Sequence, residues 1–388
     1  MIGAKMITSD PSRRFSIRSL ARKAGPMFLI FVSILLACIL IVVGFLQLQS
    51  PGKPAPYVDA NGKTLPNSLS EKVRLDINGV EQGMFIKSKD VSHPVLLYLH
   101  GGMPDYFLTE KYPTGLEDLF TVCYWEQRGT GISYDPNAPR AAINTEQMIS
   151  DTLAVTNYLR QRFGQEKIYL MGHSGGSFFG IQAAARAPEL YYAYIGEAQM
   201  TDQLESEWLA YEYMLAQFKA NGNRKMVQRL EAAPVTLDGG TPAAYLALRD
   251  EAMHPLGIGT MHAMKSVFTG LFLPSLLSRD YTLVEKLNFW RAKARSGASV
   301  MWPELISTDL RKQTPELAIP VYFFEGIYDY TISYTLAKSY FESLKAPVKG
   351  FYTFAQSAHS PMFEEPVKMQ QFFREDVLAG ANRLADAD

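Results

Sequence analysis

Three residues whose side chains could do chemistry together follow one another along the chain in the order serine, aspartate, histidine. Ser174 lies in MGHSGGSFFG, Asp329 follows the apolar run PVYFFEG, and His359 follows KGFYTF. A serine hydroxyl attacks a carbonyl when a histidine takes its proton and an acid orients that histidine. We therefore predict Ser174 as nucleophile, His359 as base and Asp329 as acid, acting on an ester or amide. Glu325 is the alternative acid, but it lies within the predicted strand.

The surroundings of Ser174 distinguish a nucleophile from a chance glycine-rich turn. A G-x-S-x-G match is weak by itself. Here a predicted strand (167–172) precedes it and a predicted helix (177–187) follows it, which is the setting of a nucleophile elbow. Neighbouring chains pass close to such a turn, so we expect that Gly172 and Gly176 must lack a Cβ.

An acyl-transfer site also needs two backbone N–H donors for the oxyanion. Gly175, directly after the nucleophile, is expected to supply one of them. The second should come from a loop after an earlier strand, and LLYLHGGMPD places Gly102 there, with Met103 as the alternative. We interpret His100 as a residue that hydrogen-bonds to hold this turn.

The elements that must position these residues alternate between strands and helices. PVLLYLH (94–100) and FTVCYWE (120–126) are apolar runs typical of buried parallel strands. Residues 143–164 have helical periodicity and end at a glycine, and 73–77 and 82–88 predict a hairpin around Asn78-Gly79. This alternation predicts an α/β fold, a mostly parallel sheet flanked by helices.

Residues 200–316 break the alternation and read as helices joined by loops. We therefore assign 71–200 and 316–388 to the core and 201–315 to an inserted helical cap over the carboxyl edge of the sheet, where ligands bind in open α/β sheets. Its methionines and aromatic residues indicate an adaptable apolar pocket.

The first fifty residues have the pattern of a membrane-targeting segment. Residues 25–46 are uncharged and apolar, and at 1.5 Å per residue they span about 33 Å, enough for the hydrocarbon core. Basic residues precede them, so the positive-inside rule places the N-terminus in the cytoplasm. We expect a cytoplasmic tail (1–24), a transmembrane signal anchor (25–47), a linker (48–70) and an extracytoplasmic hydrolase domain. A secreted protein released by signal cleavage is the alternative.

Composition excludes several other classes of function. The 388 residues have a net charge of −1, and the basic N-terminus leaves a mildly acidic body, which argues against a nucleic-acid partner. The two cysteines, Cys38 and Cys123, cannot form a disulfide framework, and the six histidines include no H-E-x-x-H motif. We expect no metal and no organic cofactor.

Taken together, these motifs resemble those of the proline iminopeptidases and their α/β-hydrolase relatives. HGGMPD (100–105), which contains Gly101, is similar to the family's HGGPG oxyanion loop, and EQRGTG (126–131) is similar to its DQRGSG segment. GHSGG and the late Asp329 and His359 complete the resemblance. It implies the α/β-hydrolase fold, the same three catalytic residues, and Arg128 as a support for the oxyanion loop.

The resemblance also bears on the substrate. Proline iminopeptidases hold a free ammonium group with acidic cap residues, which here would be Glu205, Glu207 and Glu212. The chain departs from the family where Gly175 replaces a tryptophan. The sequence thus predicts a membrane-anchored serine hydrolase acting on a small ester, amide or short peptide, including N-terminal prolyl peptides. The alternatives are a carboxylesterase for hydrophobic esters, without peptidase activity, and a non-catalytic ligand-binding homologue.

Overall fold

The computed structural model describes residues 17–139, 142–293 and 297–387. It divides into a helical unit that ends at Gln49 and a larger unit from Ser50 to Asp388, and each is described by itself. Residues 1–16 of the predicted cytoplasmic tail lie outside the described part.

The first unit contains one long helix, α1 (Ile17–Leu48). Its segment Phe28–Leu48 is long and apolar enough to cross a bilayer, and a signal sequence would have the same properties. This finding confirms an apolar N-terminal helix. Membrane insertion and topology remain predictions.

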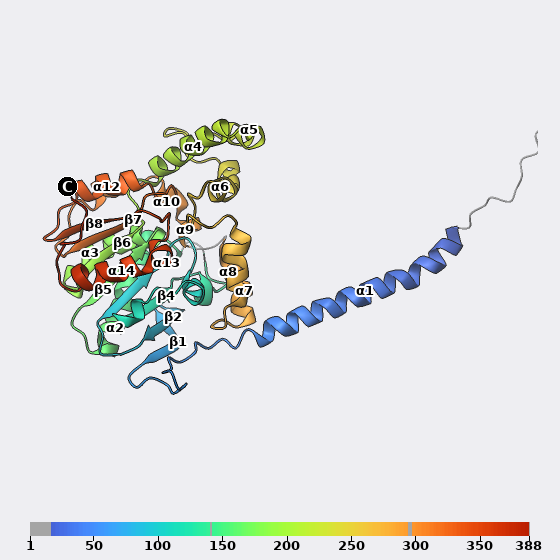
Figure 1. Cartoon of the computed structure of the whole chain (residues 1–388), viewed down its shortest axis with the longest axis horizontal. Helices are drawn as coiled ribbons and strands as arrows, with labels where there is room; N and C mark the ends of the chain where they lie inside the picture. Colours follow the sequence, from blue (N-terminus) through green and yellow to red (C-terminus); the bar gives the residue numbers. More distant parts are fainter. Residues whose placement is uncertain (1–16, 140–141, 294–296, 388) are drawn as a thin grey trace, which may run out of the picture. The chain divides into compact units, whose positions relative to one another are not determined.

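The larger unit is built on an eight-stranded sheet with the order β1-β2-β4-β3-β5-β6-β7-β8 (Figure 1). β1 and β2 form the predicted hairpin, and β2 pairs antiparallel with β4. All later pairings are parallel. The strands are β1 (Leu69–Ile77), β2 (Val80–Ser88), β3 (Val95–Leu99), β4 (Thr121–Glu126), β5 (Ile168–His173), β6 (Tyr191–Glu197), β7 (Val321–Gly326) and β8 (Lys349–Phe354).

Helices cover both faces of this sheet because its central strands are apolar on both sides. β3 sends Leu97 and Leu99 into a core shared with α2 (Thr145–Phe163), α3 (Gly175–Arg186) and α12 (Tyr334–Ser343). It sends Leu96 and Tyr98 into a second core, to which the C-terminal segment contributes. That segment comprises α13 (Pro361–Glu364), α14 (Pro366–Phe372) and the π-helical turn Phe373–Val377.

The segment between β6 and β7 is helical, as its sequence predicts. Its helices are α4 (Gln203–Ala220), α5 (Arg224–Glu231), α6 (Ala243–Leu256), the π-helical η6 (Phe268–Phe272), α7 (Leu273–Leu277), α8 (Leu283–Lys293), α9 (Gly297–Val300), α10 (Trp302–Leu305) and α11 (Leu310–Gln313). The first three share a small apolar core of their own. The fold is therefore an α/β sheet with a helical insertion, in agreement with the prediction.

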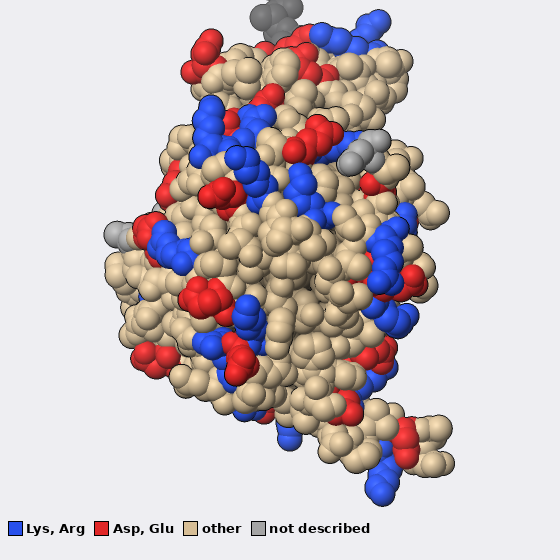
Figure 2. Space-filling model, turned by 90° about the vertical axis from the view of Figure 1, so that its left-hand side faces the viewer, with Lys and Arg blue, Asp and Glu red and all other residues tan. Residues whose placement is uncertain are grey.

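Charge is mixed on the face of the larger unit shown in Figure 2. Lysine and arginine side chains alternate there with aspartate and glutamate side chains. A nucleic-acid-binding face is expected to be predominantly basic. This face therefore gives no support to a nucleic-acid partner.

Candidate active site

Ser174 occupies a sharp turn between β5 and α3. Its backbone has φ 54° and ψ −122°, a conformation that residues with a side chain rarely adopt. A Cβ on Gly176 would lie 2.2 Å from the carbonyl oxygen of Leu99, and one on Gly172 would lie 2.7 Å from that of Gly176. Both contacts are with backbone, which cannot move aside easily, so the glycines are needed where the sequence places them.

Asp329 and His359 come together from the ends of β7 and β8. Nδ1 of His359 lies 2.8 Å from Oδ2 of Asp329, and both side chains are buried. The other oxygen of Asp329 accepts the backbone N–H groups of Thr331 (2.8 Å) and Ile332 (3.0 Å). Asp329 is thus fixed at both oxygens. The alternative acid, Glu325, instead accepts the backbone N–H of Gln199.

Burial sets the charge state of His359. Desolvation lowers the pKa of its imidazole below the usual 6.5, while the carboxylate of Asp329 acts in the opposite direction. The imidazole is therefore mostly neutral at pH 7. A neutral imidazole oriented by a carboxylate can accept a proton.

The loop after β3 lies against the nucleophile. Gly102 and Met103 line the same cavity as Ser174 and Gly175. A Cβ on Gly101 would lie 2.8 Å from the Cβ of Ser174, so the loop approaches the turn this closely because residue 101 is a glycine. The arrangement leaves Gly102 and Gly175 as the candidate oxyanion donors.

His100 holds the start of this loop, as the sequence analysis expected. Its ring nitrogens contact the carbonyl oxygen of Gly101 (2.9 Å) and the hydroxyl of Thr130 (3.1 Å). Burial lowers the pKa of His100 to about 4, so its ring is neutral. Gln127 donates from its side chain to the carbonyl oxygen of His100 (3.2 Å).

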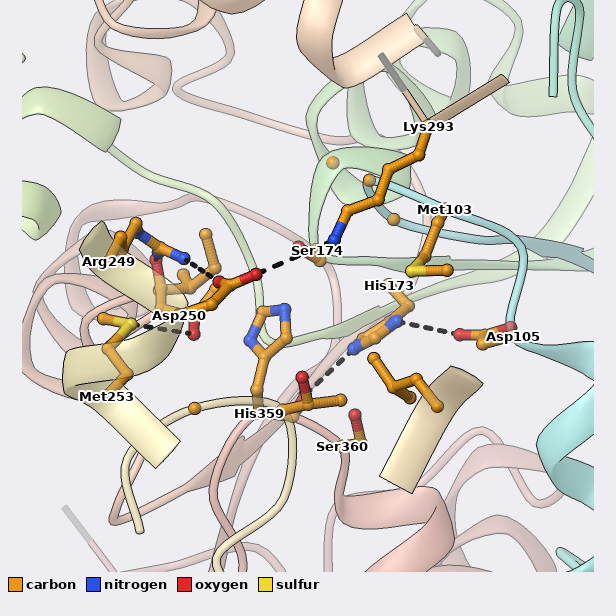
Figure 3. A pocket seen from close by; sticks show the side chains of 18 of the residues that line it. Met103, Asp105, His173, Ser174, Arg249, Asp250, Met253, Lys293, His359 and Ser360 are labelled. Atoms are coloured by element: carbon orange, nitrogen blue, oxygen red, sulfur yellow. Dashed lines mark hydrogen bonds and ion pairs between the residues drawn. The ribbon is translucent and has the colours of Figure 1, made fainter. Parts of the chain in front are cut away.

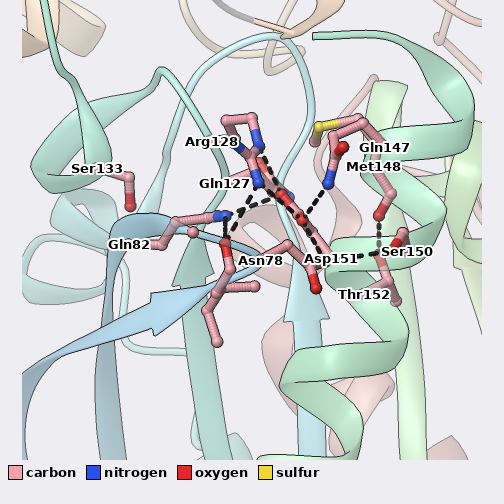
Figure 4. Close-up of polar contacts among 12 residues, drawn as sticks. Asn78, Gln82, Gln127, Arg128, Ser133, Gln147, Met148, Ser150, Asp151 and Thr152 are labelled. Carbon is pink, nitrogen blue, oxygen red and sulfur yellow. Dashed lines mark hydrogen bonds and ion pairs between the residues drawn. The ribbon is translucent and has the colours of Figure 1, made fainter. Parts of the chain in front are cut away.

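The role expected for Arg128 needs correction. Its guanidinium makes a two-point ion pair with buried Asp151 (2.7 and 3.0 Å; Figure 4) and contacts the carbonyl oxygen of Ile77, and neither partner belongs to the oxyanion loop. Its neighbour Gln127 makes the contact with the loop. Asp151 also accepts the side-chain amides of Asn78, Gln82 and Gln147. Arg128 therefore stabilises the junction of hairpin, β4 and α2.

The three cap glutamates do not occupy the predicted position either. Glu207 is fully buried and paired with Arg249 (2.8 Å) and the hydroxyl of Tyr245 (2.8 Å). Glu205 pairs with Arg311, and Glu212 is exposed. None of the three lines the cavity that contains Ser174. The prediction took acidic residues on α4 as a subsite, although the helix directs Glu205 and Glu207 toward arginine partners and Glu212 toward solvent.

The cavity over Ser174 has a volume of about 450 Å³ and lies between core and cap (Figure 3). His359 and Ser174 face it together. Half of the other lining side chains are apolar: Met103, Pro104, Phe107, Leu108, Met200, Leu246, Met253, Leu271, Trp302, Leu305 and Ile332. Its charged cap residues are Arg249, Asp250 and Lys293, with Asp250 lying 3.8 Å and 3.7 Å from the two cations.

Sequence reasoning missed a second buried pair beside the site. Nδ1 of His173 lies 3.2 Å from Asp105, and Nε2 lies 2.9 Å from the carbonyl oxygen of His359 (Figure 3). Burial opposes charging of this ring, but Asp105 and Glu197 outweigh it and raise the pKa of His173 to about 9. The only signal was the place of His173 directly before the nucleophile.

No group of three histidine, cysteine, aspartate or glutamate side chains within the described residues could hold a metal ion.

Comparison with known proteins agrees with this fold. A family model described as alpha/beta hydrolase fold matches residues 94–366. "Probable aminopeptidase YbaC" of Bacillus subtilis (strain 168) is 29% identical over 303 residues, which cover 77% of this chain and 93% of that protein.

Solved structures show the same fold at lower identity. Proline iminopeptidase of Mycobacterium smegmatis superposes with a TM-score of 0.59 at 17% identity, covering 80% of this chain and all of that one. A bacterial membrane phospholipase A superposes with a TM-score of 0.53 at 16% identity, covering 94% and 96%. At these identities the similarity establishes the fold and leaves the substrate open.

Proposed function

The chain belongs to the alpha/beta hydrolase family, and we propose that it is a serine hydrolase of carboxylic esters or amides. One observation carries the proposal. Ser174, in its strained turn, faces the same cavity as His359, whose Nδ1 lies 2.8 Å from Asp329. This arrangement supports Ser174 as nucleophile, His359 as base and Asp329 as acid in an acyl transfer.

The proposed reaction has two halves. The Ser174 hydroxyl attacks the carbonyl carbon while His359 takes its proton, and the N–H groups of Gly175 and Gly102 stabilise the oxyanion. Collapse of the intermediate breaks the bond to the alcohol or amine, which leaves with the proton from His359. Water then attacks the acyl-enzyme, His359 takes its proton, and the carboxylic acid leaves as Ser174 regains a hydrogen.

The cavity lining favours esters with an apolar acyl group. A peptidase specific for free N-termini needs an anion to hold the ammonium, and the glutamates expected to provide it lie elsewhere. Asp250 is the cap carboxylate in the lining, and its neighbours Arg249 and Lys293 already balance its charge. We therefore place carboxylesterase activity first.

Aminopeptidase activity is the second candidate. It is favoured by the relative named a probable aminopeptidase, which matches 77% of this chain. In that case Asp250 would be the group that receives the substrate ammonium, since it lines the cavity. Exchange of Asp250 for asparagine would then raise KM for an N-terminal prolyl substrate and leave an ester's KM unchanged.

We further propose that α1 anchors the enzyme in a membrane with its N-terminus in the cytoplasm and the hydrolase unit outside. Its 21-residue apolar segment spans about 32 Å at 1.5 Å per residue. A C-terminal tag on the full-length protein would report the mature size. Recovery of a species shortened by about fifty residues in the soluble fraction would favour the cleaved-signal alternative.

The catalytic proposal is tested on full-length protein in detergent. A fluorophosphonate probe should label the wild type but not Ser174→Ala, and Ser177→Ala should label like the wild type. Turnover of a series of aryl esters and of a proline arylamide then ranks the two candidates. Absence of labelling in correctly folded wild type would favour the non-catalytic homologue.

A further inference from the structure

Exposed apolar side chains gather on two contacting helices of the cap. The segment from η6 to α7 and the following α8 carry five of them, which we call the α7–α8 patch: Phe268, Leu273, Leu277, Val284 and Leu287. Figure 1 shows α7 and α8 together, and the ring of Phe272 lies 5.2 Å from that of Trp290. Single exposed apolar residues need no explanation, but five within twenty residues mark a contact surface.

The patch lies beside the residue at which the larger unit begins. The buried ammonium of Lys286 donates to the hydroxyl of Ser50 and to the carbonyl oxygen of Leu276, both at 2.8 Å. The N–H of Gly52 donates to the carbonyl oxygen of Arg279 (3.1 Å). The chain that emerges from the apolar helix is therefore fastened to the loop between α7 and α8.

The tether to the apolar helix is very short. Gln49 is the single residue between Leu48, where that helix ends, and Ser50. Consecutive Cα atoms are about 3.8 Å apart, so two links reach at most about 8 Å. If α1 crosses a bilayer, Ser50 and the adjoining patch must stay close to the headgroups.

Basic side chains accompany the patch. Lys265, Arg279 and Arg291 are exposed on the same stretch of chain. Apolar side chains with lysine and arginine around them are typical of surfaces that lie in the boundary between lipid headgroups and acyl chains. Positive charge there is attracted to anionic lipids.

The same helices also form a wall of the active-site cavity. Leu271, on η6, is buried and lines the cavity with Ser174. Phe289 of α8 packs edge-on against Phe107, another lining residue, with ring centroids 5.2 Å apart. The segment that carries the patch thus also contributes Leu271 to the cavity and supports the lining residue Phe107.

We propose that the α7–α8 patch lies on the bilayer surface and that the substrate is a lipid carboxylic ester taken from that bilayer. The proposal rests on the proposed function, because it needs both the anchoring helix and the nucleophile. Ser174 would attack the acyl carbonyl, and water would release the fatty acid and the lipid alcohol. The apolar cavity would receive the acyl chain.

Contact with the bilayer is tested without reference to activity. An environment-sensitive fluorophore is attached to a Val284→Cys variant and to a Val367→Cys variant, both carrying Cys38→Ala, in vesicles of phosphatidylcholine and phosphatidylglycerol. Val367 is a matched control because it is also highly exposed (79%, against 65% for Val284) but lies on α14. We expect blue-shifted emission and quenching by brominated lipid at Val284 alone. Equal behaviour at both sites, or a shift at Val284 that depends on protein concentration and not on brominated lipid, would overturn the proposal; the latter would indicate a second copy.

Use of a lipid ester is tested with the pair Val284→Glu and Val367→Glu. Val284→Glu should lower hydrolysis of phospholipid in vesicles by about tenfold, which corresponds to about 1.4 kcal/mol, because a carboxylate replaces an apolar side chain at the lipid boundary. A water-soluble butyrate ester should be hydrolysed within about twofold of wild type by both variants. Loss of phospholipid hydrolysis in both variants alike, or in neither, contradicts the lipid proposal. Failure of the wild type on the butyrate ester instead contradicts the proposed function.

Discussion

Nε2 of His173 lies 2.9 Å from the backbone carbonyl oxygen of His359, so the residue before the nucleophile contacts the residue that carries the proposed base. Asp105 lies 3.2 Å from Nδ1 of His173 and accepts the hydroxyl of Tyr98 at 2.6 Å. The pKa of His173 is raised to about 9, so the ring is charged at neutral pH, bonds to the carbonyl oxygen of His359 through Nε2 and pairs by charge with Asp105. The buried imidazolium of His173 thereby holds the backbone of the loop that carries His359.

Asp105→Asn should impair catalysis through this contact. It removes the carboxylate that keeps His173 charged, and the donor to His359 is weakened. A misplacement of about 1 Å in a reacting group can reduce the rate about 100-fold, so we expect kcat to fall by about 10- to 100-fold with KM nearly unchanged. Steady-state kinetics on a soluble ester measure the effects on kcat and on KM separately. A matched Asp118→Asn change at an exposed, salt-bridged aspartate should leave both constants alone, and a pure KM effect in Asp105→Asn would exclude positioning.

The pair formed by His173 and Asp105 should make the stability of the folded protein depend on pH. The pKa of His173 rises from 6.5 to about 9 on folding, which corresponds to about 3 kcal/mol in favour of the folded state. Because the folded pKa is the higher one, this contribution is complete below pH 6.5 and disappears as pH rises through about 9. The free energy of unfolding of wild type minus that of His173→Gln should therefore shrink by about 3 kcal/mol between pH 6 and pH 10. A difference that is constant over this range would show that His173 is not charged.

The pH dependence of activity should identify the base and its acid. Burial lowers the pKa of His359, and the neutral ring is the active form, so kcat/KM should rise with pH and level off with a midpoint below 6.5. Asp329→Asn should lower kcat by about 10³- to 10⁴-fold, since it removes the partner of Nδ1. Burial raises the pKa of Glu325 well above its usual range, so that side chain is neutral and Glu325→Gln should change little. Comparable losses in both variants would leave the choice of acid open to revision.

The local sequence pattern was sufficient to predict the strands of the sheet. It was also sufficient to propose the candidate residues that follow the strands. The strand–turn–helix around Ser174 and the short runs before Asp329 and His359 can be read within a dozen residues each. The contacts that sequence reasoning missed join distant segments: His173 meets a carbonyl 186 residues away, and Asp151 meets Gln82 69 residues away. No local periodicity encodes such pairs. The error over Glu207 has the same origin, because its partner Arg249 lies on another helix.

Substitutions of the neighbouring residues Gln127 and Arg128 should have different effects, one on kcat and the other on stability. Arg128→Met leaves Asp151 buried without its cation, which typically costs 3–5 kcal/mol, so we expect a clear loss of stability. Gln127→Leu removes the donor to the carbonyl oxygen of His100 and should lower kcat about tenfold by loosening the oxyanion loop. Chemical unfolding and ester kinetics on both variants distinguish the two. A variant of Arg128 with normal stability and low kcat would instead support the role predicted from the sequence, in which Arg128 supports the oxyanion loop.

The cap glutamates provide a test of the substrate assignment. Glu207→Gln keeps the shape of the side chain but removes the anion that lies 2.8 Å from Arg249, leaving only the longer ionic contact with Asp250 (3.8 Å), so it should destabilise the protein by about 1–3 kcal/mol. Glu212→Gln, on the same helix but exposed, should leave stability within about 0.5 kcal/mol. Neither change should alter KM for a proline arylamide relative to KM for an uncharged ester, because neither side chain lines the cavity. A selective rise of KM for the arylamide in Glu212→Gln would mean that the cap moves to bring this glutamate to the substrate, and it would return aminopeptidase activity to first place.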